Sequence, residues 1–185
     1  YIAYQQALEL WNEAHVGGDY TLLEQAEPYF AQATGSAPDF YQAWLLRADR
    51  HSHLLLDMSE GRAEYDEAAW QQYVTERDVM LDAALDSAET QAQRSIVAAN
   101  RLLFSEDWAD AYTVVFDSLG AQGCVNDNWL QSLVGLYPDL DARLAYNERL
   151  VACDPLNPEA VMALGDVRLA RGEYEEALVI AERLA

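Results

Sequence analysis

The chain has 185 residues, 51% of them apolar, so it can bury a core without needing a metal or a disulfide. No stretch of about eighteen consecutive apolar residues occurs, which excludes a membrane-spanning helix, and no secretory signal pattern is present. The net charge of −21, with 32 acidic residues against 11 arginines and no lysine, repels phosphate backbones and anionic lipids, so neither direct nucleic-acid binding nor membrane contact is expected.

Apolar residues recur with helical period along the whole chain, and no segment alternates like a strand. Turn signals such as Gly17-Gly18, Gly61 and Gly172 separate the amphipathic stretches. In chain order the predicted helices are 2–16, 20–34, 39–58, 65–88, 90–104, 107–120, 126–137, 139–153, 158–171 and 173–185. Because short turns join antiparallel helices, we expect five helical hairpins.

A short acidic motif recurs along the chain at unequal spacing. The stretch "EYEEA" from Glu173 has relatives in "DYTLL" from Asp19, "EYDEA" from Glu64, "DWADA" from Asp107 and "DLDAR" from Asp139. Successive starts are 45, 43, 32 and 34 residues apart. A period near 34 residues with two helices per unit is typical of a helical solenoid.

The last repeat carries the clearest local signals. Asn157 is placed to cap a helix that begins at Pro158, where the missing backbone N–H has no consequence. Gly172 is placed to end that helix, because only glycine adopts the left-handed conformation cheaply. We expect the small residues Gly165 and Ala177 to permit a close crossing of two helices, with Tyr174 filling the space beside them.

These features resemble the tetratricopeptide repeat family, in outline over the whole chain and most closely in the last repeat. The resemblance implies an all-α, right-handed superhelix of about five hairpins that forms one domain over residues 1–185. The run "QALELWNEAHVGGDYTLLEQAEPYFAQATGSAPDFYQAW" is also similar to tetratricopeptide regions that follow winged-helix regulators or nucleotide cyclases in bacteria. Because the chain opens on Tyr1 and helical patterns reach both ends, we expect a fragment of a longer protein.

The resemblance also implies a concave groove lined by the first helix of each hairpin. The repeat phase directs a set of polar side chains toward it, namely Gln5, Asn12, Gln93, Asn100, Asn128, Ser132 and Asp166. Amides donate to and accept from an extended backbone, so these residues are candidates for binding a peptide or a partner domain. The alternative is a solvated, unused face. The family's mode of clamping a C-terminal carboxylate with lysines is set aside, because the chain has no lysine, although Arg101 and Arg168 could partly substitute.

No nucleophile elbow, phosphate loop or zinc-spaced Cys/His set occurs, so no enzymatic activity is expected. Asp49, His53 and Asp57 follow one another at four-residue spacing on one helix face, which makes a metal site conceivable. No fourth ligand is evident, and a charge-paired surface histidine is the favoured interpretation. His51 points in another direction than His53. We therefore expect no metal and no other cofactor.

Cys124 and Cys153 fall at helix ends that meet in an antiparallel hairpin, so they either form a disulfide or remain two packed thiols. The predicted helical architecture favours a non-catalytic protein–protein interaction scaffold, and the resemblance implies that it belongs to a bacterial signalling or transcription-regulatory protein. The alternative is a ligand-sensing regulatory domain of a transcriptional regulator or cyclase. The expected location is cytoplasmic, or periplasmic if an upstream membrane segment anchors the protein.

Overall fold

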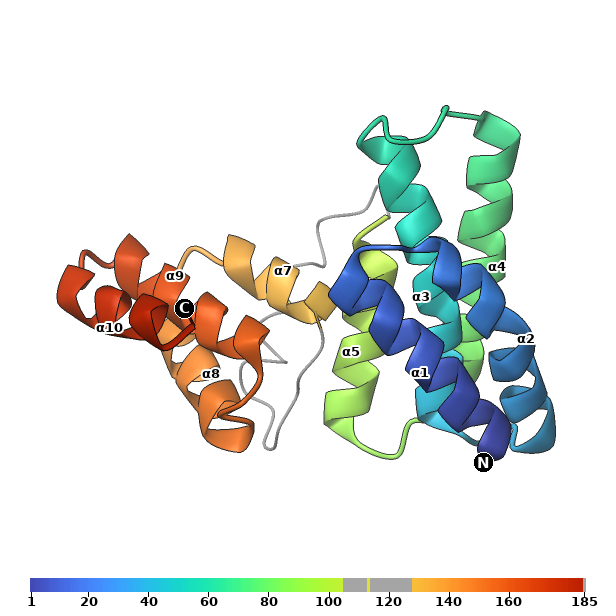
Figure 1. The fold of residues 1–185 in the computed structure, drawn as a ribbon, viewed down its shortest axis with the longest axis horizontal. Helices are drawn as coiled ribbons and strands as arrows, with labels where there is room; N and C mark the ends of the chain where they lie inside the picture. The colour runs from blue at the N-terminus through green and yellow to red at the C-terminus, as the bar shows by residue number, and fades with distance from the viewer. Residues whose placement is uncertain (105–112, 114–127, 185) are drawn as a thin grey trace. The chain divides into compact units, whose positions relative to one another are not determined.

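The computed structural model describes residues 1–104, 113 and 128–184, and every regular element in them is an α-helix (Figure 1). The helices are α1 (Ile2–Gly17), α2 (Thr21–Ser36), α3 (Tyr41–Ser59), α4 (Glu67–Asp86), α5 (Gln91–Leu102), α7 (Asn128–Leu136), α8 (Leu140–Cys153), α9 (Pro158–Ala170) and α10 (Tyr174–Leu184). The all-α class is therefore confirmed for this part of the chain. The predicted helix 107–120 falls, except for residue 113, outside the described residues.

The chain forms two compact units, residues 1–89 and residues 90–185. In the first unit α1 packs on α2, α2 on α3 and α3 on α4. In the second unit α7 contacts both α5 and α9, α8 packs on α9, and α9 packs on α10. The pairs α1–α2, α3–α4 and α9–α10 agree with the expected hairpins. The single domain over residues 1–185 and the right-handed tetratricopeptide superhelix stay predictions.

Local capping explains where several helices begin and end. The side chain of Asn157 accepts hydrogen bonds from the two backbone amides that follow Pro158, as the sequence predicted. Thr90 and Gln93 form a capping box at the start of α5, in which each side chain bonds the other residue's backbone N–H. Gly172 follows α9 with φ of 79°, so the predicted left-handed glycine is confirmed.

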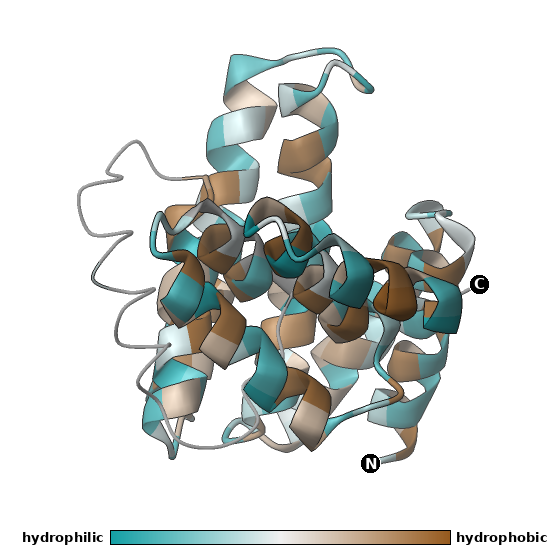
Figure 2. Cartoon of the chain, turned by 90° about the vertical axis from the view of Figure 1, so that its left-hand side faces the viewer, coloured by the Kyte–Doolittle hydropathy of each residue, from teal (hydrophilic) through white to brown (hydrophobic). Residues whose placement is uncertain are grey.

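The core of the first unit is built from aromatic and small residues on facing helices. It contains Tyr4 and Ala7 of α1, Ala26, Phe30 and Ala33 of α2, and Ala43 and Leu46 of α3. The alanines let the helix backbones approach, and the aromatic rings fill the remaining space. Figure 2 shows that the helices carry apolar and hydrophilic residues side by side, as amphipathic packing requires.

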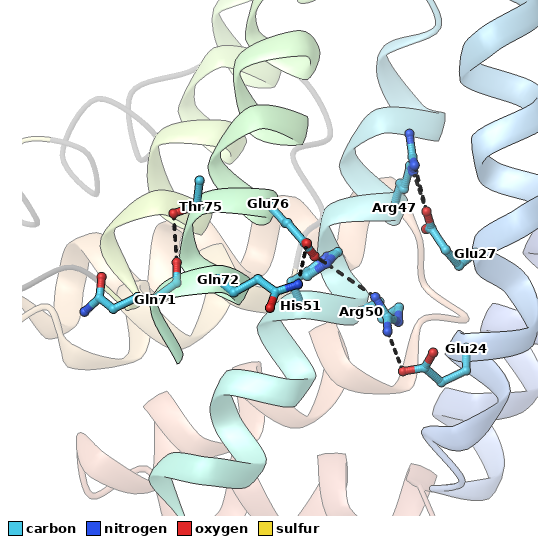
Figure 3. A network of polar contacts seen from close by, with 9 residues as sticks. All are labelled: Glu24, Glu27, Arg47, Arg50, His51, Gln71, Gln72, Thr75 and Glu76. Atoms are coloured by element: carbon cyan, nitrogen blue, oxygen red, sulfur yellow. Dashed lines mark hydrogen bonds and ion pairs between the residues drawn. The ribbon is translucent and has the colours of Figure 1, made fainter. Parts of the chain in front are cut away.

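Polar contacts connect α3 to both of its neighbours in the first unit (Figure 3). Arg47 of α3 donates to Glu27 of α2 at 2.9 and 2.7 Å through two guanidinium nitrogens. On the α4 side, Nε2 of His51 lies 2.9 Å from Oε2 of Glu76. Both Arg47 donors converge on Oε1 of Glu27, and together with the His51 contact they tie α3 to both neighbouring helices.

The close crossing predicted in the last repeat is present, but its participants differ. Gly165 of α9 faces Ile180 of α10 rather than Ala177. Tyr174 is 68% exposed, so it does not fill the space beside the crossing. Tyr174 is the first residue of α10, whereas the contact with Gly165 is made by Ile180 further along that helix.

Candidate functional site

Two of the predicted groove residues lie on α1 in the first unit. Gln5 is half-buried and Asn12 is exposed. They are seven residues apart, which is two turns, and so occupy nearly the same face of the helix. Their binding role stays a prediction.

The two predicted groove residues on α5 are engaged within their own helix. Oε1 of Gln93 accepts the backbone N–H of Thr90 at 3.0 Å as part of the capping box. Asn100 is 3% exposed and donates from Nδ2 to the carbonyl oxygen of Ile96 at 2.9 Å. Both amides therefore have a structural role, which the repeat phase alone did not reveal. Burial leaves Asn100 little surface to offer a partner.

The remaining predicted groove residues belong to α7 and α9. Asn128 and Ser132 lie on α7, but their side chains are outside the described part of the chain. Asp166 is exposed on α9 and lines a cavity of about 350 Å3 in the second unit. Other side chains that line this cavity are Gln131 of α7, Arg143 and Asn147 of α8, and Glu159 and Met162 of α9.

Arg143 is a basic side chain of this cavity, and it has no partner within the described part of the chain. Among the described residues its guanidinium makes no hydrogen bond and no ion pair, and its Nε is buried. Arg168, which the sequence suggested as a substitute for the family's lysines, instead donates to Glu148 and to Glu173, both at 2.7 Å. An unsatisfied buried donor is costly, and it is therefore a candidate ligand contact.

Arg143 was missed because sequence reasoning looked for groove residues only on the first helix of each hairpin. α8 was predicted as the second helix of a hairpin, yet its residues Arg143 and Asn147 line the cavity. They are four residues apart on one helix face. This Arg-x-x-x-Asn spacing is the signal that was available.

A second group of polar residues gathers in the first unit, where α1 meets α3. Nε2 of His15 lies 3.1 Å from Nε2 of His53 and 3.3 Å from Oδ2 of Asp49. Nε2 of His53 lies 3.6 Å from Oδ2 of Asp49, so the three atoms form a triangle. Asp49 and His53 are buried, at 6% and 7% exposure, and His15 is half-buried. Three side chains that commonly bind metals therefore converge on one point.

This geometry corrects the grouping expected from the sequence. Asp57 was expected beside Asp49 and His53, but its carboxylate accepts a hydrogen bond from Arg62 at 2.7 Å. His15 takes its place, contributed by another helix. His53 is also a buried residue, not a surface one. Burial lowers the pKa of His53, and the neighbouring Asp49 carboxylate opposes that change.

His51 does not join this group. Its side chain is buried against α4, where Nε2 meets Glu76 at 2.9 Å (Figure 3). Burial lowers the pKa of His51, and the hydrogen bond to Glu76 opposes that change. The expectation that His51 and His53 point in different directions is confirmed.

Cys153, the last residue of α8, is disulfide-bonded. Cys124 lies outside the described residues, so the pairing of these two cysteines stays a prediction.

No helix in the described residues combines the length and the apolar character needed to cross a bilayer. No protein-family model, curated protein or solved structure matches the chain.

Proposed function

We propose that this chain is a non-catalytic protein-interaction module that holds the C-terminal carboxylate of a partner peptide in the cavity of the second unit. The observation that carries the proposal is Arg143, a cavity-lining guanidinium with a buried Nε and no internal partner in the described part of the chain. In a protein with 32 acidic residues, an arginine without a carboxylate partner is available for an external one.

The surroundings of Arg143 suit a peptide terminus better than a polyanion. Asn147 and Gln131 supply amides that donate to and accept from a peptide backbone. Glu159 and Asp166 are exposed carboxylates that accept hydrogen bonds from the backbone N–H groups of a peptide. They repel any negative charge on the ligand beyond its terminal carboxylate. Met162, which is 55% exposed, offers an apolar contact for a side chain of the peptide.

We further propose that the module belongs to a bacterial signalling or transcription-regulatory protein, as the resemblance to the tetratricopeptide family implies. The disulfide at Cys153 favours the periplasmic location over the cytoplasmic one. Disulfides persist in oxidising compartments, whereas cytosolic reductants keep thiols free.

The experiment measures binding of the purified chain to an array of octapeptides, each printed once with a free C-terminal carboxylate and once as the amide. We expect binding to a subset of the free acids and at least tenfold weaker binding to their amides. Arg143→Gln should remove this difference, because glutamine keeps the polar contact but loses the charge.

Arg149→Gln is the matched control. Arg149 lies on the same helix, is exposed, stacks its guanidinium 5.9 Å from the ring of Tyr146 and does not line the cavity. Arg149→Gln should leave peptide binding unchanged. Equal binding of acids and amides, retention of binding in Arg143→Gln, or the absence of any binding peptide would each contradict the proposal.

The second candidate function is a ligand-sensing regulatory domain. The observation that favours it is a cavity of about 500 Å3 in the first unit, which is within the size range of small-molecule pockets. It is lined by the turn residues Gly18 to Thr21 and by His53, Asp57 and Arg62. A thermal-shift screen of small molecules tests it, since a bound ligand raises the melting temperature of the chain.

A further inference from the structure

The triangle formed by His15, Asp49 and His53 has the dimensions of one face of a tetrahedral metal site. Zinc binds imidazole nitrogen and carboxylate oxygen at about 2.0–2.1 Å, so two ligand atoms of a tetrahedral site lie about 3.3–3.4 Å apart. The three separations in the structure, 3.1, 3.3 and 3.6 Å, bracket this value. Octahedral coordination at the same radius brings neighbouring ligands to about 2.8–3.0 Å, which fits less well.

Trp11 prepares His15 to act as a ligand. Nδ1 of His15 lies 2.7 Å from the backbone carbonyl oxygen of Trp11. A carbonyl oxygen only accepts, so Nδ1 must carry the proton, and in the neutral ring Nε2 then presents its lone pair. Nε2 is the atom that faces His53 and Asp49. A hydrogen bond from the distant ring nitrogen is the usual device that fixes the tautomer of metal-binding histidines.

Trp11 also orients the carboxylate. Its indole Nε1 donates to Oδ2 of Asp49 at 2.8 Å, and its ring stacks on His15 with the ring centres 3.9 Å apart. One tryptophan thus positions two of the three candidate ligands, from α1 and from α3. Such support is what separates a built site from a chance encounter of polar residues.

His53, the third candidate ligand, packs against an aromatic ring and borders a cavity. The ring of Tyr20 stacks on His53 at a centre-to-centre distance of 4.0 Å and an interplanar angle of 22°. His53 lines the cavity of about 500 Å3, which leaves room for a water or another group as a fourth ligand. The net charge of −21 also favours the accumulation of cations.

We propose that His15, Asp49 and His53 bind one divalent transition-metal ion, best matched by Zn2+, with the fourth coordination position open toward the cavity. Two imidazoles and one carboxylate are a ligand set that suits zinc and other late first-row ions. The site closes a crossing between α1 and α3, so the bound ion also ties these two helices together.

The experiment titrates the chelator-treated 185-residue chain with ZnCl2 by calorimetry. We expect one Zn2+ per chain, with the affinity lowered at least tenfold by His15→Gln, by Asp49→Asn and by His53→Gln. Titration with CoCl2 adds a geometric readout, because tetrahedral Co2+ absorbs visible light much more strongly than octahedral Co2+.

His51→Gln is the matched control. His51 is a buried histidine on the same helix, two residues from His53, and it faces Glu76 instead of the triangle. Its replacement should leave zinc affinity unchanged. Equal affinity in all three ligand variants would place the bound zinc elsewhere and overturn the proposal. The absence of stoichiometric binding would identify the triangle as a hydrogen-bonded trio instead.

A measurement on the unsubstituted protein protects the test against variants that fail to fold. Long-range 1H–15N spectra of the imidazole rings report each Nε2 separately. Addition of Zn2+ should shift the Nε2 signals of His15 and His53 and leave that of His51 in place. Shifts confined to His51, or no imidazole shift despite bound zinc, would overturn the proposal. Because the peptide cavity lies on other residues, failure of either proposal leaves the other standing.

Discussion

Gly165 of α9 lies so close to Ile180 of α10 that a Cβ atom on residue 165 would be 3.2 Å from Cγ2 of Ile180. Ordinary carbon–carbon contacts lie at about 3.5–4.0 Å, so any side chain at this position pushes against α10. Glycine in the middle of α9 weakens that helix by about 1 kcal/mol relative to alanine. The loss of helix propensity at Gly165 is offset because α9 can pack more closely against α10.

We expect Gly165→Ala to gain much less than about 1 kcal/mol of unfolding free energy in the natural chain, because the new methyl group meets Cγ2 of Ile180. In an Ile180→Ala background, where Cγ2 is gone, the same substitution should recover nearly the full gain. A double-mutant cycle by urea unfolding measures this coupling. An additive cycle would show that the two residues do not meet.

Arg143→Met should leave the unfolding free energy unchanged or raise it by up to about 1 kcal/mol, because a buried donor without a partner is replaced by apolar surface. Arg168→Met should lower it by about 0.5–1 kcal/mol, since Arg168 is 22% exposed and loses its bonds to Glu148 and Glu173. Urea midpoints compare the two variants. An equal or larger loss in Arg143→Met would indicate a structural role for that arginine.

Gly17 and Gly18 should respond to alanine in opposite ways, although neither has a neighbour within 4 Å of a new Cβ. Gly17 is helical, so Gly17→Ala should stabilise the chain by a few tenths of a kcal/mol. Gly18 has φ of 69°, where alanine is strained, so Gly18→Ala should cost about 1 kcal/mol. Thermal unfolding of both variants checks this prediction. A lower melting temperature in both variants would contradict it and would indicate that residue 17 makes a contact.

Tyr4 should make the stability of the chain fall more steeply at alkaline pH. Burial raises the pKa of Tyr4, and the neighbouring Tyr1 raises it further. The folded pKa then lies above the unfolded value of about 10, so folding is favoured below about pH 10 and loses this contribution as the pH rises toward the folded pKa. Tyr4→Phe should flatten the decline in urea midpoint above about pH 9.5. An unchanged slope would contradict this assignment.

Native protein should resist alkylation, because Cys153 is disulfide-bonded. Mass spectrometry after iodoacetamide should find no label without reductant and two labels after reduction and unfolding. We expect reduction to lower the unfolding free energy by about 2–4 kcal/mol, since a disulfide restricts the unfolded chain. Two labelled thiols in unreduced protein would exclude the bond.

The helices were predictable because their signals are local. Asn157 and Pro158 start α9 where expected, and Gly172 adopts the expected left-handed conformation just after it. Caps and glycine turns act over three or four residues, so a single sequence shows them. Gln93 was assigned to a groove although it completes the capping box with Thr90, a local signal that the repeat phase obscured.

The site residues were less predictable because they depend on how helices cross. His15 meets His53 across 38 positions of sequence, and no spacing within one helix predicts that meeting. The expected grouping of His53 with Asp57 followed helical spacing correctly, but Arg62 in the following turn competes for that carboxylate. Arg143 depends in the same way on the approach of α8 to α9. Such contacts require the angle between two helices, which a local pattern does not contain.

α10 has no buried residue in the described part of the chain and packs against α9. Its backbone amides should therefore exchange with deuterium earlier than those of α9, because a helix that buries few side chains opens more readily. No residue that lines the Arg143 cavity comes from α10. In a deuterium-uptake experiment α10 therefore serves as an internal control. Peptide binding should slow amide exchange in α8 and α9 and leave the exchange rate of α10 unchanged.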